Sequence, residues 1–539
     1  MNPDLDATTL SDIETKLAGC RISGLHFHSN DIEPGNLFVA IRGTHSDGHQ
    51  YIEQAIKKGA AAVIGEKDIS ALPVPYIRVA NARRVLALLA SKFYNYPSRN
   101  HTVIGITGTN GKTSTAYLLR HIIQTSGTRC SLFGTVEHII NGRKILSKNT
   151  TPDALSLQKW MNESNDPVVI MEASSHGIDQ ERIYGIALDC AVFTNLSHDH
   201  LNYHRQMNDY FEVKSSLFKQ LKTSGTAIIN GDDAWGKSLL ERLRAEHTPL
   251  KSFGVSESCD LQLIDIKERW QPRCQMKEGG KTYSFRLPLP GKHNIYNAMA
   301  AYLVARCLHI DPQTIIHALQ TFPGVPGRAE KYIHPHGATF IIDYAHTPQG
   351  LDQFLGSLKR CGAKHLIHIF GFRGNGDPSK REKMIHISNK YSDALILTMD
   401  DLGPVKAEEM TEQLKQLSRI GAKRHCTIIE DRTLAIQHAW RQAKEKDWIV
   451  VTGKGPETYE QSFTLPTRSD RETILYLLNE ADKSSKASIN RSISKPDPDQ
   501  PEYHPAFQYQ PINGPFPEKH PPPFVPQQTV ADELYWPDE

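Results

Sequence analysis

The sequence lacks Cys-X-X-Cys pairs, long apolar runs and a large net charge, and each absence excludes a class of protein. Its eight cysteines are scattered along 539 residues, which argues against structural zinc and a disulfide framework and predicts reduced thiols in a cytoplasmic protein. No apolar stretch approaches the ~20 residues that span a bilayer, and the polar, acidic start is unlike a signal peptide, so we expect no membrane insertion. A net charge of +2 gives no global field for binding nucleic acid.

What is present is the composition of a globular protein with several α/β domains. Hydrophobic residues make up 39% of the chain, enough for several cores. Residues 1–98 predict a small α/β domain that ends where Pro97 stops a helix. In residues 99–326 apolar strands alternate with helices, which is typical of a mostly parallel sheet covered on both faces, with an antiparallel excursion over residues 251–290.

The last part of the sequence predicts a third α/β domain and a tail. A hinge-like segment rich in proline and glycine, residues 323–327, precedes the third domain, which we expect over residues 327–482. Residues 483–539 contain twelve of the 32 prolines and few aliphatic side chains. Such a segment cannot bury enough surface to offset its ordering entropy, so we predict a disordered, proline-rich tail that is partly polyproline II. Its aromatic side chains leave a partner-binding role open, and the sequence does not identify the partner.

The most informative stretch runs from Gly105 to Ser114 and reads Gly-Ile-Thr-Gly-Thr-Asn-Gly-Lys-Thr-Ser. It lies between an apolar strand and a helix-like segment, an order that directs backbone N–H groups and a helix N-terminus at a phosphate chain. Lys112 would supply a cation for the β and γ oxygens, and the Thr113 hydroxyl could ligate Mg²⁺. The common spacing has a glycine where this chain has Ile106, so the strict Walker pattern is missed by one residue. The stretch nevertheless predicts an ATP site.

Two further polar clusters follow apolar strands of the same predicted sheet. One spans residues 172–177 and contains Glu172 and His176. The other spans residues 194–200 and contains three ionisable side chains in a row, His198 to His200. Ligands of parallel sheets collect at the carboxyl ends of the strands. We therefore expect both clusters to meet the glycine-rich loop in space.

Four motifs together resemble the Mur ligase family, and within it the ligases that add the third amino acid to UDP-N-acetylmuramoyl-dipeptide. They lie at residues 107–113, 171–177, 195–204 and 343–348, and the similarity covers about residues 20–480 in the family's order, without the tail. The resemblance implies an α/β fold of three domains: a UDP-sugar-binding domain, a central P-loop ATPase domain with a parallel sheet, and a Rossmann-like domain that binds the amino acid. Folylpolyglutamate synthase, a sister ligase with the same loop, is an alternative.

The implied chemistry is an ATP-dependent ligation in peptidoglycan precursor synthesis. The γ-phosphoryl group of ATP would pass to the terminal carboxylate of UDP-N-acetylmuramoyl-L-alanyl-D-glutamate. A free amino acid would then attack the acyl phosphate through its amine and release phosphate. The resemblance implies nucleotide contacts from the loop and from three residues further along the chain: Gly108, Thr109, Asn110, Gly111, Lys112, Thr113, Ser114, Asn294 (or Asn297), Arg328 and Asp343.

For catalysis and metal binding the resemblance implies Lys112, Thr113, Glu172, His200 and Lys214. Glu172 and His200 match Mg²⁺ ligands of the family, although a hard cation ordinarily prefers oxygen, so His200 depends on the resemblance. Lys214 falls where family members carry a carbamylated lysine that ligates a second Mg²⁺. From the residues alone, Lys214 would be a solvated helix lysine.

The implied contacts to the UDP-sugar peptide are spread over three segments. They are Ser29, Thr44, His45 and Ser46 for the uridine, Asn149, Thr150 and Thr151 for the muramoyl part, and Ser174, Gln180 and Arg182 nearby. One departure concerns the first domain, where the family's Asp-Ser-Arg is replaced by His28-Ser29-Asn30.

The amino-acid pocket departs further from the family pattern. Asp401 belongs to a segment where diaminopimelate-adding members read Asp-Asn-Pro-Arg, but Pro404 stands at the arginine position. The family's Gly-Gly-Asp-Arg-Asp loop also lacks its arginine, which is replaced by Gly376, while Arg373 and Arg381 lie nearby in the sequence. The remaining family contacts, Gly453 and Glu457, are present.

The two missing arginines lead to the hypothesis that diaminopimelate is not the substrate. They also leave a second alternative, an ATP-binding scaffold or regulator whose amino-acid pocket has degenerated. The sequence does not determine which amino acid is added, whether Lys214 is modified, or the oligomeric state.

Overall fold

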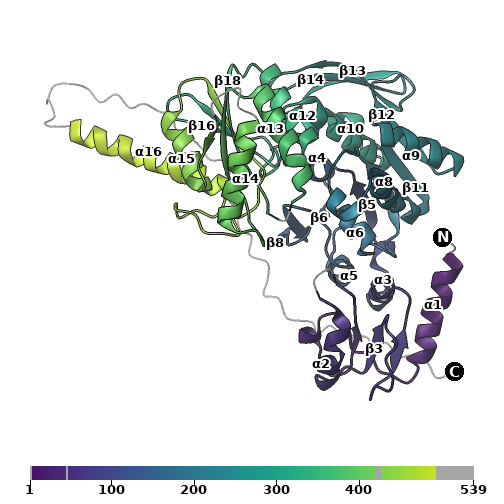
Figure 1. Cartoon of the computed structure of the whole chain (residues 1–539). Helices are drawn as coiled ribbons and strands as arrows, with labels where there is room; N and C mark the ends of the chain where they lie inside the picture. The colour runs from purple at the N-terminus through teal and green to yellow at the C-terminus, as the bar shows by residue number, and fades with distance from the viewer. Residues whose placement is uncertain (1–2, 44–45, 375, 421–425, 493–539) are drawn as a thin grey trace, which may run out of the picture.

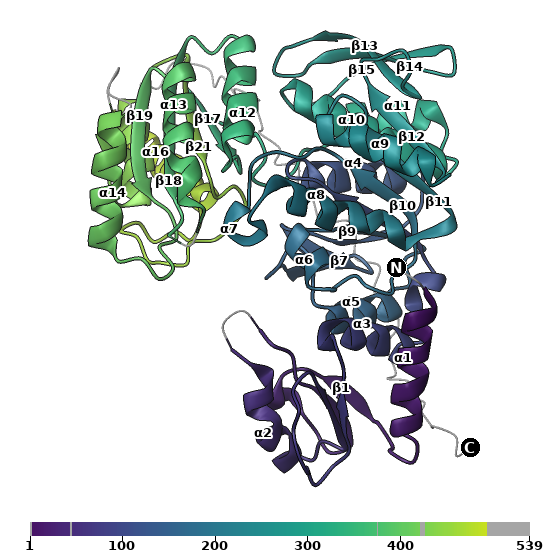
Figure 2. The same ribbon diagram turned by 45° about the vertical axis from the view of Figure 1, so that its right-hand side comes forward.

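The computed structural model describes residues 3–43, 46–374, 376–420 and 426–492. Its three β-sheets have four, eleven and six strands and occupy separate stretches of the chain, which we call the first, central and third units. The first unit lies at the bottom of Figures 1 and 2, the central unit lies above it, and the third unit lies beside the central one. All three units are α/β, as the sequence predicts.

The first unit is a small parallel sheet with the strand order β1-β2-β3-β4. Its strands are β1 (Gly24–His26), β2 (Asn36–Val39), β3 (Ala62–Gly65) and β4 (Tyr76–Arg78). Its helices are α1 (Pro3–Lys16), α2 (Ile52–Lys57) and α3 (Ala82–Phe93), with short 3-10 turns η1 (Ser29–Asp31), η2 (Gly48–Tyr51) and η3 (Pro97–Arg99). The Asn81 side chain caps α3 by accepting a hydrogen bond from the Arg84 N–H at 3.0 Å.

The central unit has the strand order β15-β14-β13-β12-β11-β10-β5-β9-β6-β7-β8. Its strands are β5 (Thr102–Thr107), β6 (Cys130–Phe133), β7 (Glu137–Ile140), β8 (Arg143–Leu146), β9 (Val168–Glu172), β10 (Leu188–Phe193), β11 (Leu221–Asn230), β12 (Leu250–Gly254), β13 (Leu261–Lys267), β14 (Arg273–Glu278) and β15 (Lys281–Arg286). The middle of the sheet, β6-β9-β5-β10-β11-β12, is parallel. The predicted antiparallel excursion is formed by β13, β14 and β15.

Helices cover both faces of the central sheet. They are α4 (Lys112–Thr125), α5 (Ala154–Glu163), α6 (Ser175–Asp179), α7 (Leu201–His204), α8 (Met207–Ser215), α9 (Ala234–Ala245), α10 (Lys292–Cys307) and α11 (Pro312–Gln320), with η4 (Ser216–Gln220). Along β5, Ile104 and Ile106 pack in the core under α4, α10 and α11, whereas Val103 packs in the core of the opposite face. A strand buried on both faces is continuously apolar for this reason.

The third unit has the order β16-β17-β21-β18-β19-β20, parallel except for the β16–β17 pair. Its strands are β16 (Glu330–Ile333), β17 (Thr339–Asp343), β18 (His365–Phe372), β19 (Ala394–Met399), β20 (Cys426–Ile428) and β21 (Asp447–Thr452). Its helices are α12 (Pro348–Arg360), α13 (Arg381–Tyr391), α14 (Ala407–Ile420), α15 (Arg432–Gln442) and α16 (Asp470–Ser492), with η5 (Pro378–Lys380).

The structure corrects the sequence-based description of the tail. The tail was predicted to begin at residue 483, but α16 continues to Ser492, since no proline interrupts the chain before Pro496. Residues 493–539 lie outside the described part of the chain. None of the helices in the described ranges is long and apolar enough to cross a membrane.

Candidate active site

The glycine-rich loop, residues 108–111, connects β5 to α4 at the carboxyl end of the central sheet, and we call it the phosphate loop because the sequence predicts that it binds phosphates. Gly108 and Gly111 have φ values of +142° and +88°, which L side chains rarely adopt. A Cβ atom on Gly108 would lie 1.9 Å from the Thr194 hydroxyl oxygen, and one on Gly111 would lie 2.3 Å from the Asn297 amide oxygen. These glycines let the loop pass close to β10 and α10, which leaves the opposite side of the loop open to a ligand.

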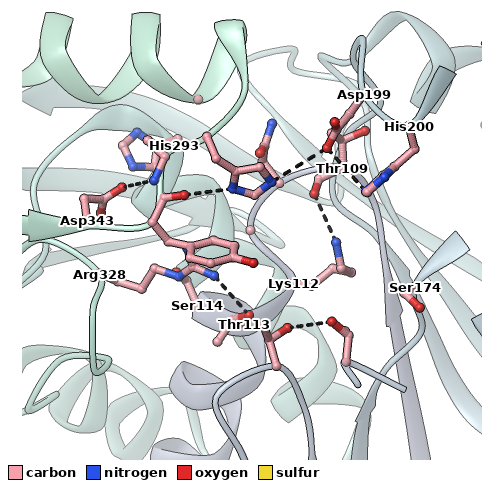
Figure 3. A pocket seen from close by; sticks show the side chains of 18 of the residues that line it. Thr109, Lys112, Thr113, Ser114, Ser174, Asp199, His200, His293, Arg328 and Asp343 are labelled. Atoms are coloured by element: carbon pink, nitrogen blue, oxygen red, sulfur yellow. Dashed lines mark hydrogen bonds and ion pairs between the residues drawn. The ribbon is translucent and has the colours of Figure 1, made fainter. Parts of the chain in front are cut away.

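The Lys112 side chain folds back over the loop at the start of α4. Its amine donates hydrogen bonds to the Gly108 carbonyl at 2.9 Å and the Thr109 carbonyl at 3.0 Å. Burial lowers the pKa of Lys112, and the carboxylates of Glu172 and Asp199 oppose that shift. The amine is therefore placed where an anion held by the loop would contact it (Figure 3).

Thr113 and Glu172 are in direct contact beneath this loop. The Thr113 hydroxyl donates to a Glu172 carboxylate oxygen at 2.8 Å, and the Thr135 hydroxyl and backbone N–H donate to the same carboxylate at 2.8 and 2.9 Å. Glu172 is fully buried at the end of β9. A hydroxyl beside a carboxylate is an oxygen donor set that suits Mg²⁺, which usually keeps several waters and phosphate oxygens as further ligands. Among the described residues, no three or more His, Cys, Asp or Glu side chains are grouped closely enough to hold a metal by themselves.

Lys214 is buried beside the same loop, with 1% of its surface exposed. Its amine donates to the Gly108 carbonyl at 2.9 Å and lies 4.7 Å from the Tyr210 ring centre. Burial and the nearby Lys112 charge lower the pKa of Lys214 well below its ordinary value. The expectation of a solvated helix lysine, drawn from the residues alone, is wrong because α8 packs against the phosphate loop.

Asp199 connects the central unit to the third unit. Its carboxylate pairs with the Lys380 amine at 3.2 Å and lies 3.4 Å from the His200 ring nitrogen and 3.9 Å from that of His346. Burial lowers the pKa of His200 to about 4, with Asp199 opposing the shift, so its ring is neutral near pH 7 and has a nitrogen available as a ligand. No role was predicted from the sequence for Asp199, Lys380 or His346, although Asp199 lies in the run His198-Asp199-His200 and His346 lies in the motif at residues 343–348.

The third unit also reaches the phosphate loop directly. The Arg328 guanidinium donates to the Thr113 hydroxyl at 3.5 Å and lies 4.0 Å from the Tyr344 ring centre. Asp343 accepts hydrogen bonds from the Ala329 and Ala345 N–H groups, both at 2.8 Å, which fixes the chain around Arg328. Figure 3 shows Arg328, Asp343 and Thr113 from these different elements facing one region.

A cavity of about 520 Å³ opens between the central and third units. Residues from the loop, from the predicted muramoyl segment, from the first turns of α10 and from the third unit all line it. The predicted site residues among them are Thr109, Asn110, Gly111, Lys112, Thr113, Ser114, Asn149, Thr150, Ser174, Gln180, Arg182, His200, Asn294, Arg328 and Asp343. The structure thus brings most of the predicted nucleotide and substrate residues to one cavity.

The predicted muramoyl residues form a hydrogen-bonded network at the edge of this cavity. The Thr151 hydroxyl donates to the Glu172 carbonyl at 2.7 Å and lies 3.1 Å from the Ser174 hydroxyl. Arg182 donates to the Thr151 carbonyl at 2.7 Å and to the Gln180 amide oxygen at 2.8 Å. The network ties these side chains to the same strand end that carries Glu172.

Other predicted residues lie away from this cavity. Ser29 is buried in the first unit, where its hydroxyl donates to the Gln54 amide oxygen at 3.0 Å. The Ser46 carbonyl accepts a hydrogen bond from the Gly43 N–H at 2.8 Å. Thr44 and His45 lie outside the described residues.

The predicted amino-acid residues lie at the carboxyl ends of strands of the third sheet. Lys454 is fully buried and pairs with Asp400 at 3.4 Å and with Asp401. Glu457 accepts a hydrogen bond from the Tyr344 hydroxyl at 2.7 Å and pairs with Arg373. Gly453 has a φ of +107°, and a Cβ there would lie 3.3 Å from an Asp400 carboxylate oxygen.

The fold and the loop define a class: an enzyme that binds a nucleoside triphosphate at the end of a parallel sheet, with a second α/β unit facing the loop. The sequence matches the Mur ligase middle domain over residues 106–305, the Mur ligase glutamate ligase domain over residues 327–455 and the Mur ligase catalytic domain over residues 21–94.

Named relatives cover most of the chain. The UDP-N-acetylmuramoyl-L-alanyl-D-glutamate--2,6-diaminopimelate ligase of Alkaliphilus oremlandii is 37% identical over 81% of this chain and 90% of that protein. The ligase of the same name from Aquifex aeolicus is 38% identical over 82% and 90%. A solved structure of a ligase of that name has a TM-score of 0.61 and 27% identity, covering 86% of this chain and 95% of that one. The chain belongs to the Mur ligase family, and it is an ATP-dependent amino-acid ligase.

Proposed function

We propose that this chain joins a free amino acid to UDP-N-acetylmuramoyl-L-alanyl-D-glutamate in peptidoglycan precursor synthesis. One observation carries the proposal: the phosphate loop, the Ser174–Arg182 network and the third unit line a single cavity. A ligase needs a phosphoryl donor, a carboxylate and an amine in one place, because their alignment supplies much of the rate enhancement. The names of the relatives, which are 37% and 38% identical, support the same substrate.

The phosphoryl-transfer half of the reaction is assigned to the loop. A carboxylate that attacks the γ-phosphorus of ATP meets like-charge repulsion, and fixed cations reduce that cost. Lys112 contributes a charge at the loop, and Arg328 contributes a second one from the third unit, 3.5 Å from the Thr113 hydroxyl. Bound Mg²⁺ would neutralise phosphate charge, and we propose Thr113, Glu172 and His200 to hold it, with a carbamylated Lys214 for a second ion.

The remaining binding roles are proposed for residues of all three units. For the adenine we propose Asn294, whose amide donates to the Pro290 carbonyl at 2.8 Å and accepts from Asn297 at 3.2 Å. For the uridine we propose Ser29, Thr44, His45 and Ser46 of the first unit. For the amino acid we propose Asp401, Gly453 and Glu457. A third unit that closes over the loop would exclude water from the acyl phosphate, which water otherwise hydrolyses.

The test is a complete reaction with the purified chain, ATP, Mg²⁺, the UDP-muramoyl-dipeptide and a mixture of amino acids. We expect ADP release that requires the dipeptide and an amino acid, and a product heavier than the dipeptide by one amino acid less water. Lys112→Ala should abolish release while the protein stays folded. Nucleotide binding without ADP release under every amino acid would overturn the proposal and favour the scaffold alternative.

A further inference from the structure

Four neighbouring parallel strands of the third sheet end side by side at the same edge of the sheet. In the order β17-β21-β18-β19, these ends carry Tyr344, Lys454, Arg373 and Asp400. Strand ends of this kind collect ligands because their loops diverge from the edge of the sheet. Arg373 lines both the large cavity and a smaller one of about 40 Å³ behind it. It therefore stands between the phosphate loop and the interior of the third unit.

The loop after β18 carries its arginine at an unusual position. Against the family's Gly-Gly-Asp-Arg-Asp, this chain reads Arg-Gly-Asn-Gly-Asp over residues 373–377, with arginine first instead of fourth. Gly374 must stay glycine, because a Cβ there would lie 1.7 Å from the Leu402 carbonyl oxygen. Gly376 has room, since its nearest neighbours would be Arg373 atoms at 3.4 and 3.5 Å. The loop has lost one guanidinium and gained another on the same turn.

The Arg373 side chain is only partly satisfied by the protein. One terminal nitrogen pairs with Glu457, but its buried Nε has no hydrogen-bond partner among the described residues, and the nearest Asp400 oxygen is 4.0 Å away. A third of the side chain is exposed. Burial lowers the pKa of Arg373, but Tyr344, Glu457 and two aspartates raise it by more, so the guanidinium is charged. A partly exposed cation with one donor unpaired is suited to an anion from a ligand.

The other cations around this pocket are already engaged. Lys454 is fully buried between Asp400 and Asp401. Arg381 donates to the Gln413 side chain and to the Arg373 carbonyl, so it supports the backbone of the loop. Lys380 pairs with Asp199 of the central unit at 3.2 Å. Among these four described cations, Arg373 is the one that lines both cavities and has a donor, Nε, without a hydrogen-bond partner.

We propose that Arg373 and Glu457 form the specificity-determining pair for the incoming amino acid, with Arg373 binding a carboxylate and Glu457 an ammonium at its far end. This inference rests on the proposed function. A substrate that carries both groups at that end, such as 2,6-diaminopimelate, would replace the ion pair between Arg373 and Glu457. Its carboxylate would pair with Arg373 and its ammonium with Glu457. Lysine offers only the ammonium and leaves Arg373 without an anion. The proposal reverses the hypothesis against diaminopimelate, whose basis was the loss of the arginines at positions 376 and 404.

The experiment compares diaminopimelate and lysine as substrates of the full chain and of Arg373 variants. We expect the wild type to favour diaminopimelate. Arg373→Ala should raise the KM for diaminopimelate roughly 10- to 100-fold, the factor typical of a lost charged hydrogen bond, with little change in the KM for ATP. Arg373→Lys should recover only part, since an ammonium cannot bind a carboxylate in the bidentate geometry of a guanidinium. The paired variant Arg373→Gly with Gly376→Arg should recover more, because it returns the arginine to the family's position.

Arg441, an exposed arginine on α15 of the same unit, gives the matched control, and Arg441→Ala should change neither KM. Unchanged diaminopimelate KM in Arg373→Ala, or a wild type that prefers lysine, would overturn the inference and leave the ligase proposal standing. Absence of ADP release with any amino acid in the wild type would overturn both. An unchanged KM for ATP shows that the variants are folded.

Discussion

Lys112 and Lys214 donate hydrogen bonds to the same acceptor, the carbonyl oxygen of Gly108, each at 2.9 Å. Two ammonium groups this close repel each other, and burial disfavours their charge further. The pKa of each amine is lowered by burial, and the Lys112 charge lowers that of Lys214 further. The structure therefore makes Lys214 the better candidate for a neutral, nucleophilic amine beside the phosphate loop.

The first prediction is that Lys214 reacts with carbon dioxide and functions as a carbamate. A carbamate converts the second ammonium into an anion, which removes the repulsion with Lys112 and supplies oxygen ligands for Mg²⁺. Lys214→Ala should lower kcat roughly 100- to 1,000-fold, the scale of losing one electrostatic contact to the transition state. Lys219→Ala, at an exposed lysine of η4, is the control and should retain activity. Carbon-13 NMR with labelled bicarbonate should show a carbamate signal that is absent from Lys214→Ala; its persistence there would contradict the assignment.

The second prediction concerns the hydroxyl of Thr113. Thr113→Val removes the oxygen that contacts Glu172 and should raise the Mg²⁺ concentration needed for half-maximal activity by roughly 10-fold or more. Thr113→Ser keeps the hydroxyl and should need nearly the wild-type concentration. ADP release measured over a series of Mg²⁺ concentrations compares the two variants. An equal Mg²⁺ requirement in both would mean that Thr113 is not a ligand.

The parts of the site that could be predicted are those that a short, continuous stretch of sequence encodes. The phosphate loop is one short stretch, and its glycines are required by local geometry at Gly108 and Gly111, so the sequence was enough to locate it. The alternation of apolar strands with helices in the central unit was predicted because parallel strands that are buried on both faces are continuously apolar. The roles proposed for individual site residues remain predictions, although most of these residues line one cavity.

Contacts that depend on packing between distant segments were not predictable. Asp199 and Lys380 are separated by 181 residues, and nothing in either local sequence indicates the other. Lys214 has the sequence context of a solvated helix residue, and only the packing of α8 against the loop buries it. Arg373 was noted as a neighbour of the missing arginines, but its pairing with Glu457 required the relative positions of β18 and β21.

The third prediction is a loss of stability in acid that originates in part from His138. This side chain is 3% exposed on β7, and burial lowers its pKa to about 4 from an ordinary value near 6.5. A histidine whose folded pKa is depressed takes up its proton more readily when unfolded, so stability falls as the pH drops from about 6.5 to about 4. The contribution is at most about 3 kcal/mol for a shift of that size.

His138→Gln tests this because the amide oxygen can still accept the hydrogen bond from the Gly134 N–H but cannot titrate. Urea unfolding at pH 7 and at pH 4.5 should show a smaller loss of unfolding free energy in the variant than in the wild type. His247→Gln, at a histidine whose ring meets solvent on the central unit, serves as the control and should leave the difference unchanged. The same loss in His138→Gln and the wild type would mean that other groups account for the acid sensitivity.

The fourth prediction is that the Asp199–Lys380 ion pair holds the third unit against the phosphate loop in the active form. Both side chains are largely buried, with 5% and 13% exposed, so removing one leaves an unpaired charge with a large penalty. Asp199→Asn and Lys380→Met should each lower kcat by roughly 10-fold or more, and the double variant should be no worse than either single one, since coupled residues are not additive. Lys390→Met, which breaks an exposed pair with Asp352 on the same unit, should leave kcat unchanged. Full additivity of the two single effects in steady-state ADP release would show that the two charges act separately, and the contact between the units would then have no part in catalysis.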